Sequence, residues 1–132
     1  MRIVGIIKKD NEILLMQRLK NGERYCVFPG GSIENNEDEE NALKREMKEE
    51  INLIIKNGKK LFEIENQGRQ EKYYLIKEFE GTPKVSGPEK ERMNEQNQYY
   101  LEWIKISEIE KLNNLYPQEA VEKLLEFFKI HK

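Results

Sequence analysis

The segment from residue 31 to residue 53 constrains this chain most, because it joins a glycine turn to a helix that is rich in carboxylates. It reads GSIENNEDEENALKREMKEEINL. Residues three and four apart share one face of a helix, so Glu46, Glu49 and Glu50 should direct their carboxylates toward one region. Like charges about 4 to 6 Å apart repel and raise each other's pKa. Such a cluster therefore requires a cation or strong hydrogen-bond donors.

A divalent metal ion is the simplest counter-charge for this cluster. Oxygen-only ligands suit hard ions, and Mg²⁺ usually takes one or two protein carboxylates, keeps several waters and shares substrate phosphates. The pattern thus indicates metal-dependent chemistry on phosphates. The alternative is a solvated helix face, on which the same glutamates pair with Lys44, Arg45 and Lys48, because charge runs usually mean exposure.

The spacing of the whole segment favours the metal site over the solvated face. It runs Gly, five residues, Glu, seven residues, and then Arg-Glu-aliphatic-any-Glu-Glu-any-Gly-aliphatic, which resembles the signature of the Nudix hydrolases. The matching residues are Gly31, Glu37, Arg45, Glu46, Met47, Glu49, Glu50 and Leu53.

One position departs from that signature, since Asn52 stands where the family has glycine. The position follows the helix and should adopt the left-handed conformation, in which Asn is the usual substitute for Gly. We expect the exchange to be tolerated. The resemblance also extends upstream, to Arg18 at the end of an apolar run, to Phe28-Pro29-Gly30-Gly31 and to Glu34.

The resemblance implies the Nudix fold, an α+β architecture or α-β-α sandwich in which a mixed β-sheet packs between helices. The length of 132 residues suits one domain over 1–132. The resemblance further implies that Glu46, Glu49, Glu50 and the main-chain carbonyl of Gly30 bind one or more Mg²⁺ ions, with Mn²⁺ as an alternative.

The resemblance also implies roles for neighbouring side chains. A metal-bound water would attack phosphorus, and Arg45 would pair with carboxylates, including Glu37, to hold the loop against the helix. The general base would be Glu46 or a later acidic residue, for which Glu89 is the candidate, with an exposed loop glutamate as the alternative. Arg18 would bind a substrate phosphate, or it would simply end a strand with a solvated head.

Hydrophobic patterning predicts the remaining elements. Strands are expected over 2–8, 12–18, 24–28, 52–56, 60–66, 72–79 and 99–106. A loop should follow Pro29-Gly30-Gly31, and Asn57-Gly58 should join strands 52–56 and 60–66 as a hairpin. Helices are expected over 38–51, over 107–112 and from near Pro117 onward. The long connection over 81–98 predicts a functional or mobile segment, such as a lid.

Composition excludes several other classes. The net charge of −2, from 23 basic and 25 acidic residues, provides no global positive field for polymeric nucleic acid. The single cysteine, Cys26, excludes an internal disulfide, and His131 as the lone histidine excludes a Ser-His-Asp relay. No signal peptide or membrane-spanning run is evident, so we expect a cytoplasmic protein without a membrane partner. A homodimer is compatible with the sequence.

Aromatic residues on predicted strands are more often core than base-stacking, so they receive no site role. These residues are Tyr25, Phe28, Tyr73 and Tyr74.

We therefore expect a Mg²⁺-dependent hydrolase of a nucleoside diphosphate linked to another group, similar to MutT-type Nudix enzymes. Oxidised or ordinary nucleoside triphosphates rank slightly ahead of diadenosine polyphosphates as substrates because the chain is small. Neither the downstream proline of ADP-ribose hydrolases nor the motif of coenzyme A diphosphatases is found. The alternative is a non-catalytic nucleotide sensor, whose signature would often be eroded. An acidic helix that serves only as a protein interaction surface ranks last.

Overall fold

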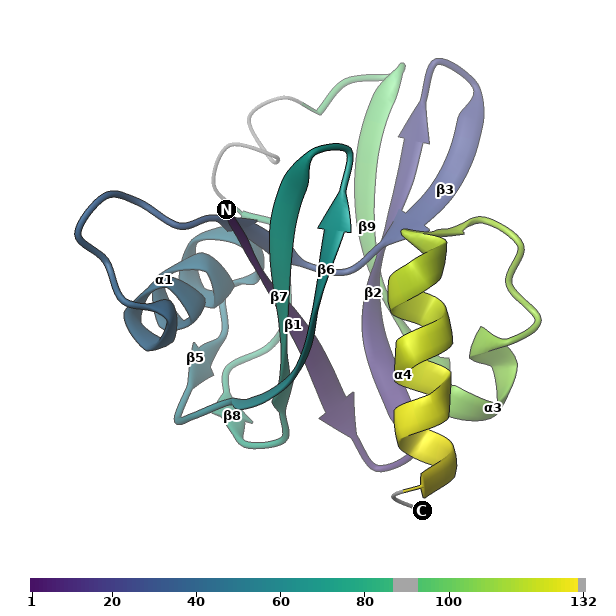
Figure 1. Ribbon diagram of the computed structural model, residues 1–132. Helices are drawn as coiled ribbons and strands as arrows, with labels where there is room; N and C mark the ends of the chain where they lie inside the picture. Colours follow the sequence, from purple (N-terminus) through teal and green to yellow (C-terminus); the bar gives the residue numbers. More distant parts are fainter. Residues whose placement is uncertain (87–92, 131–132) are drawn as a thin grey trace.

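The computed structural model describes residues 1–86 and 93–130 and is built around a curled mixed β-sheet (Figure 1). The sheet comprises β1 (Arg2–Lys9), β2 (Glu12–Lys20), β3 (Glu23–Val27), β4 (Gly30–Ser32), β6 (Lys59–Asn66), β7 (Arg69–Ile76), β9 (Asn97–Lys105) and β10 (Leu115–Tyr116). Its order is β10-β3-β2-β1-β7-β6, with β4 on β1 and β9 on β2. The pairs β1–β7 and β3–β10 are parallel and the others are antiparallel, which makes the sheet mixed, as expected.

Helices cover both faces of this sheet. The described residues form α1 (Glu39–Ile51), the short α3 (Ile106–Ile109) and α4 (Gln118–Ile130). Residues of α1 belong to one apolar core, and residues of α4 belong to another. Figure 1 shows the two long helices on opposite sides of the sheet, so the expected α+β arrangement is confirmed.

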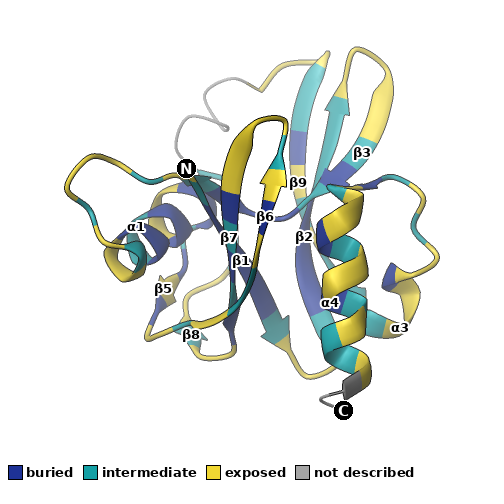
Figure 2. Cartoon of the chain, in the orientation of Figure 1, coloured by how far each residue is buried: buried dark blue, intermediate teal, exposed yellow. Residues whose placement is uncertain are grey.

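The side chains of β1 and β2 alternate between the two cores, because successive residues of a strand point to opposite faces. Ile3 and Leu14 pack in the core that contains α1. Val4 and Ile13 pack in the core that contains α4. Because both faces are covered, these strands read as continuous apolar runs, and Figure 2 shows them buried over much of their length.

The helix α1 begins and ends where the sequence predicts. Asp38 is its N-cap and accepts a hydrogen bond from the main-chain N–H of Asn41 at 2.7 Å. Asn52 has φ 60° and ψ 34°, which is the expected left-handed conformation, and its N–H donates to the carbonyl of Lys48. Leu43 and Met47 face the core from this helix.

The break expected at Pro29-Gly30-Gly31 takes a different form, because Gly30 and Gly31 belong to the strand β4, and the expected loop follows them over 33–38. Val4 pairs with Gly30, and the N–H of Gly5 donates to the carbonyl of Pro29 at 2.9 Å. A Cβ at Gly30 would lie 2.3 Å from the carbonyl oxygen of Ile3. Glycine therefore allows close strand pairing here instead of breaking the chain.

The prediction of a hairpin at Asn57-Gly58 is wrong, because β5 (Ile54–Ile55) pairs with β8 (Phe79–Glu80) and not with β6. A Cβ at Gly58 would lie 2.7 Å from the side chain of Leu43, so this glycine leaves room for α1. The hairpin lies instead between β6 and β7 at Gln67-Gly68, where both residues have positive φ. Two successive positive φ angles favour this type of two-residue turn.

The other expected elements differ mainly in length. The run over 72–79 divides into the end of β7 and β8, α3 is shorter than expected, and β10 was not predicted. The start of the last helix next to Pro117 is confirmed. Within residues 1–86 and 93–130, no helix has both the length and the apolar character that crossing a bilayer requires.

The left-handed Asn52 leads to a stability prediction. Asn52→Gly should raise the free energy of unfolding by about 0.3–1 kcal/mol, because glycine adopts positive φ without a Cβ penalty. Asn52→Ala is the matched control and should lower it by about 1 kcal/mol. Urea denaturation of the three proteins measures the differences. A destabilised Asn52→Gly variant would contradict the prediction.

Candidate metal centre

The helix α1 brings three carboxylates together at its C-terminal half. One carboxylate oxygen from each of Glu46, Glu49 and Glu50 lies within 4.8 Å of the other two. Glu46 is 5% exposed and Glu50 is 7% exposed, whereas the Glu49 side chain is half exposed. The solvated-face alternative is therefore wrong for two of the three glutamates.

Two oxygens of this cluster are buried without a partner. They are Oε2 of Glu46 and Oε2 of Glu50, and neither accepts a hydrogen bond. A buried carboxylate oxygen without a donor is costly, and its presence in a folded protein calls for an explanation such as a bound ion. Hard oxygen donors in this number fit Mg²⁺ or Mn²⁺, so the residues present fit the implied metal.

Gly31 makes the burial of Glu46 possible. A Cβ at Gly31 would lie 2.0 Å from Oε2 of Glu46, so with any larger residue that carboxylate would have to leave its present position. Gly31 lies on β4, which packs beside α1. Burial raises the pKa of the Glu46 carboxyl, and the hydrogen bond from Arg45 opposes that rise.

Arg45 connects the cluster to the loop before the helix. It donates to Glu37 through Nε at 2.7 Å and Nη2 at 2.9 Å. Its Nη1 donates to Glu46 at 2.8 Å and to Glu49 at 3.1 Å. Its Nη2 also donates to the main-chain carbonyl of Ser32 at 2.9 Å. This bidentate geometry is specific to arginine, and it lowers the pKa of Glu37 to about 2.

The chain that follows β8 crosses the C-terminal end of α1. The N–H of Lys84 donates to the carbonyl of Ile51 at 3.0 Å, and the N–H of Ser86 donates to that of Glu50 at 2.9 Å. Ser86 Oγ also bonds to the main-chain oxygen of Glu49. These bonds satisfy carbonyls that a helix end leaves unpaired. Glu89 and part of the expected lid lie outside the described residues.

Arg18 is held between two tyrosines. Its guanidinium carbon lies 4.3 Å from the ring centre of Tyr99 and 5.5 Å from that of Tyr25. Its Nη2 donates to the hydroxyl of Tyr99 at 2.7 Å and to Oδ1 of Asn97 at 3.2 Å, while its buried Nε has no partner. A freely solvated head is therefore wrong for Arg18. It lies on the same face of β2 as Met16, which packs in the core of α1.

The aromatic residues of the predicted strands have different surroundings: some lie in the core, and Tyr25 lies beside Arg18. Phe28 and Tyr73 are buried in contact with each other, with ring centres 5.8 Å apart, so the core prediction is confirmed for them. Tyr74 bonds to Glu39. The contact of Tyr99 with Arg18 was missed, because these residues are 81 positions apart and the pairing of β2 with β9 that joins them leaves no local pattern in the sequence.

Comparison with known proteins agrees with this arrangement. The sequence model of the NUDIX domain matches residues 1–124. The chain is 51% identical over 53 residues, 39% of its length, to an ADP-ribose pyrophosphatase of Methanocaldococcus jannaschii. It is 35% identical over 86 residues, 60% of its length, to an 8-oxo-dGTP diphosphatase of Haemophilus influenzae. The matched regions span 31% and 63% of those two relatives.

A solved structure supports the same fold. The chain resembles a structure from work on MutT of Aliivibrio salmonicida and Vibrio cholerae with a TM-score of 0.73 and 22% identity. The likeness covers 95% of both chains.

The contact between Gly31 and Glu46 leads to a prediction on metal binding. Gly31→Ala should displace the Glu46 carboxylate and weaken Mn²⁺ binding by about tenfold or more. Gly22→Ala is the control, since a Cβ there meets nothing within 4 Å although φ is +83°. Electron paramagnetic resonance of free Mn²⁺ measures both affinities. Equal affinity in the two variants would contradict the role of Gly31.

The pair between Arg45 and Glu37 predicts an acid dependence of stability. The folded pKa of Glu37, about 2, lies below the ordinary 4.5, so its stabilisation is present above about pH 4.5 and is lost as the pH falls toward 2. Glu37→Gln should be less stable than the wild type at pH 6, and this difference should shrink toward pH 2. Urea denaturation across this range measures the difference.

A matched control separates this effect from general acid unfolding. The pKa of Glu39 is also lowered to about 2, by hydrogen bonds from Lys72 and Tyr74. The wild type and Glu37→Gln therefore both lose stability in acid. Glu40→Gln removes an exposed carboxylate that pairs with Lys44 on the same helix. It should change stability little at any pH. A pH-independent difference for Glu37→Gln would contradict the assignment.

Proposed function

The chain belongs to the NUDIX domain family, and on this basis we propose that it hydrolyses a diphosphate bond in a nucleoside diphosphate linked to another group. The observation that carries the proposal is the pair of buried, unpartnered oxygens on Glu46 and Glu50 beside Glu49. Buried carboxylates that lack donors are suited to hold the metal that charge neutralisation at a polyphosphate requires.

The site would hold Mg²⁺, or Mn²⁺ in its place, through Glu46, Glu49, Glu50 and the main-chain carbonyl of Gly30. When bound, the ion supplies neutralisation of phosphate charge and a water of lowered pKa. Arg45 orients the ligands, because its bonds restrain Glu46 and Glu49 while its pair with Glu37 anchors it. Without the ion, the three carboxylates repel an anionic substrate.

The proton of the attacking water needs an acceptor, and two carboxylates are candidates for this role. Glu46 is the first, because its Oε2 is unpartnered and lies in the cluster itself. Glu89 is the second, because Ser86, three residues earlier in the chain, bonds to the main chain of Glu49 and Glu50. Replacing each in turn by glutamine and measuring the pH profile of turnover distinguishes them.

We also propose that Arg18 binds a substrate phosphate. Its Nε is without a partner, and Tyr25 and Tyr99 restrain its guanidinium, so less conformational entropy is lost when an anion binds. The relatives are named for ADP-ribose, 8-oxo-dGTP and RNA, and among such substrates a nucleoside triphosphate is our preferred proposal. Action in the cytoplasm on small nucleotides is part of this proposal.

Removing a ligand of the cluster should remove turnover without unfolding the protein. Glu49→Gln and Glu50→Gln should each lower turnover by about 100-fold or more at fixed Mg²⁺, because each loses a charged metal ligand. Glu40→Gln, on the exposed side of the same helix, should retain activity. Phosphate and pyrophosphate release is measured over nucleoside triphosphates, nucleotide sugars, dinucleotides and ADP-ribose. Near-normal turnover in both variants would refute the site.

The same panel distinguishes an enzyme from a nucleotide sensor. Mg²⁺ with a nucleotide that binds should raise the melting temperature by linkage in either case. An enzyme also releases product under those conditions. A melting shift without product from any substrate would refute the hydrolase proposal.

A further inference from the structure

The strand β9 lies at an edge of the sheet. It pairs with β2 along its whole length, from Asn97 to Lys105, and with no other strand of the described residues. Figure 1 shows β9 and β3 on opposite sides of β2. An edge strand presents a row of main-chain N–H and C=O groups that another chain can pair with. The outer edge of β9 is therefore a candidate interaction surface.

Hydrogen bonds just beyond the two ends of β9 show which of its main-chain groups face outward. The N–H of Asn21 donates to the carbonyl of Gln96 at 2.8 Å, and the N–H of Ile106 donates to the carbonyl of Asn11 at 2.8 Å. Both bonds continue the register of β2 with β9. Hydrogen-bonded pairs alternate along an antiparallel ladder, so the even-numbered residues of β9 bond to β2. The odd-numbered residues direct their N–H and C=O groups outward.

Three outward-facing residues of β9 have main-chain groups that are available for pairing. Asn97 is not among them, because its N–H and its carbonyl both bond to Asn94, at 3.1 and 2.9 Å. Within residues 1–86 and 93–130, no main-chain hydrogen bond joins Tyr99, Leu101 or Trp103 to a segment on the outer side of β9. Each of these residues therefore offers one donor and one acceptor to a neighbouring strand.

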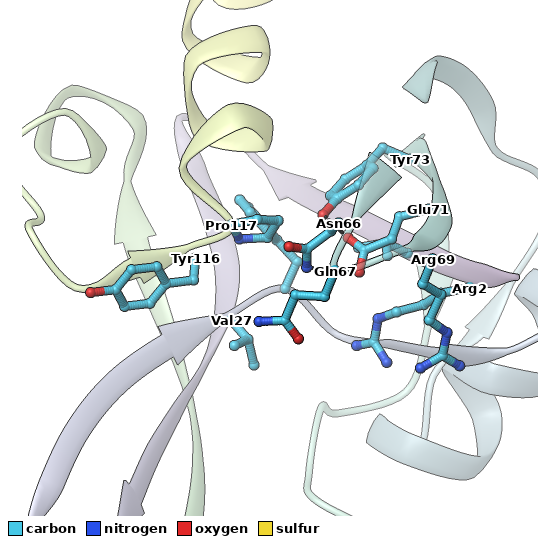
Figure 3. Close-up of a pocket in the computed structure, with 11 residues that line it drawn as sticks. Arg2, Val27, Asn66, Gln67, Arg69, Glu71, Tyr73, Tyr116 and Pro117 are labelled. Atoms are coloured by element: carbon cyan, nitrogen blue, oxygen red, sulfur yellow. Dashed lines mark hydrogen bonds between the residues drawn. The ribbon is translucent and has the colours of Figure 1, made fainter. Parts of the chain in front are cut away.

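Two other edge strands carry features that prevent pairing, and β9 lacks them. The strand β6 has an irregular register between Lys60 and Phe62 and is rich in charged residues. The strand β10 has two residues and leads directly into Pro117, which has no N–H; Figure 3 shows this proline at the start of α4. Charges, bulges, short strands and proline are the usual protection of a sheet edge. The strand β9 is regular, and Glu102 is the only charged residue over 98–104.

We propose that the outer edge of β9 pairs with the same edge of a second copy of this chain, so that one sheet continues through a two-fold dimer. A two-fold axis relates identical surfaces, and it makes the two copies of the strand antiparallel. With the axis at Leu101, this residue opposes its own copy, and Tyr99 opposes Trp103 of the second copy. Every outward N–H and C=O of these three residues then finds a partner.

The side chains and the main chain favour this register over its neighbours. With the axis at Leu101, the exposed Tyr100 opposes Glu102 of the second copy. An axis at Glu102 would place two carboxylates directly opposite each other, which is destabilising. An axis at Tyr100 would require the main-chain groups of Asn97, which already bond to Asn94.

Sedimentation equilibrium of the wild type tests the dimer. The weight-average mass should rise with concentration from the chain mass of 15.8 kDa toward twice that value and then level off. A mass of one chain at every concentration, or a mass that continues to rise beyond the dimer, would overturn the proposal. Neither result bears on the proposed hydrolysis, which the turnover assays test separately.

Variants assign the dimer to the edge of β9 and to this register. Tyr100→Glu should weaken the dimer by about tenfold or more, because it places a carboxylate opposite Glu102 at two positions of the interface. Adding Glu102→Lys should restore the dimer by making each of these pairs attractive. Ile54→Glu is the matched control, since Ile54 is 54% exposed on another strand. A folded Tyr100→Glu protein that dimerises like the wild type would overturn the assignment.

Amide hydrogen exchange of the wild type, measured by nuclear magnetic resonance, tests the interface without any substitution. The amides of Leu101 and Trp103 should be protected at concentrations where the protein is dimeric and should exchange faster on dilution. The amides of Tyr100 and Glu102 bond to β2, so they should be protected at both concentrations. Fast exchange of the Leu101 and Trp103 amides in the dimer would overturn the proposal even if the Tyr100→Glu variant does not fold.

Discussion

The packing of the Glu46 carboxylate against Gly31 is the contact on which the candidate site depends. A Cβ at position 31 would lie 2.0 Å from Glu46 Oε2, so the absence of a side chain at this position of β4 lets the carboxylate lie where it is buried. Burial of Glu46 Oε2 without a hydrogen-bond donor disfavours the ionised form of this carboxyl group. The hydrogen bond from Arg45 offsets only part of that cost. The fold thus keeps an unpaired anionic oxygen beside two further carboxylates, which suits a divalent cation.

Ser32 joins this contact to the rest of the molecule. Its carbonyl accepts from Arg45, which also holds Glu37, and its hydroxyl bonds to Arg69 on the hairpin between β6 and β7. One short strand therefore contacts α1, the loop before that helix and the hairpin that carries Arg69. The strand β4 reaches these segments because it pairs with β1, which runs beside β7.

Local rules predicted the parts of the fold that depend on neighbouring residues. Asp38 caps α1 and Asn52 closes it in the left-handed conformation because both effects operate within one helical turn. The predictions that Gly30 and Gly58 form turns were wrong, because these glycines allow close packing against Ile3 and Leu43 instead. A glycine in a sequence does not show which of these uses applies, because the atoms it accommodates belong to distant segments.

The sequence by itself determined the carboxylate cluster, since helical periodicity alone puts Glu46, Glu49 and Glu50 together. Its spacing also indicated the family. Only the tertiary structure decided how deeply these groups are buried and that Arg18 lies between Tyr25 and Tyr99. These features depend on strand register and on the approach of separate elements, which long-range packing controls and local sequence does not encode.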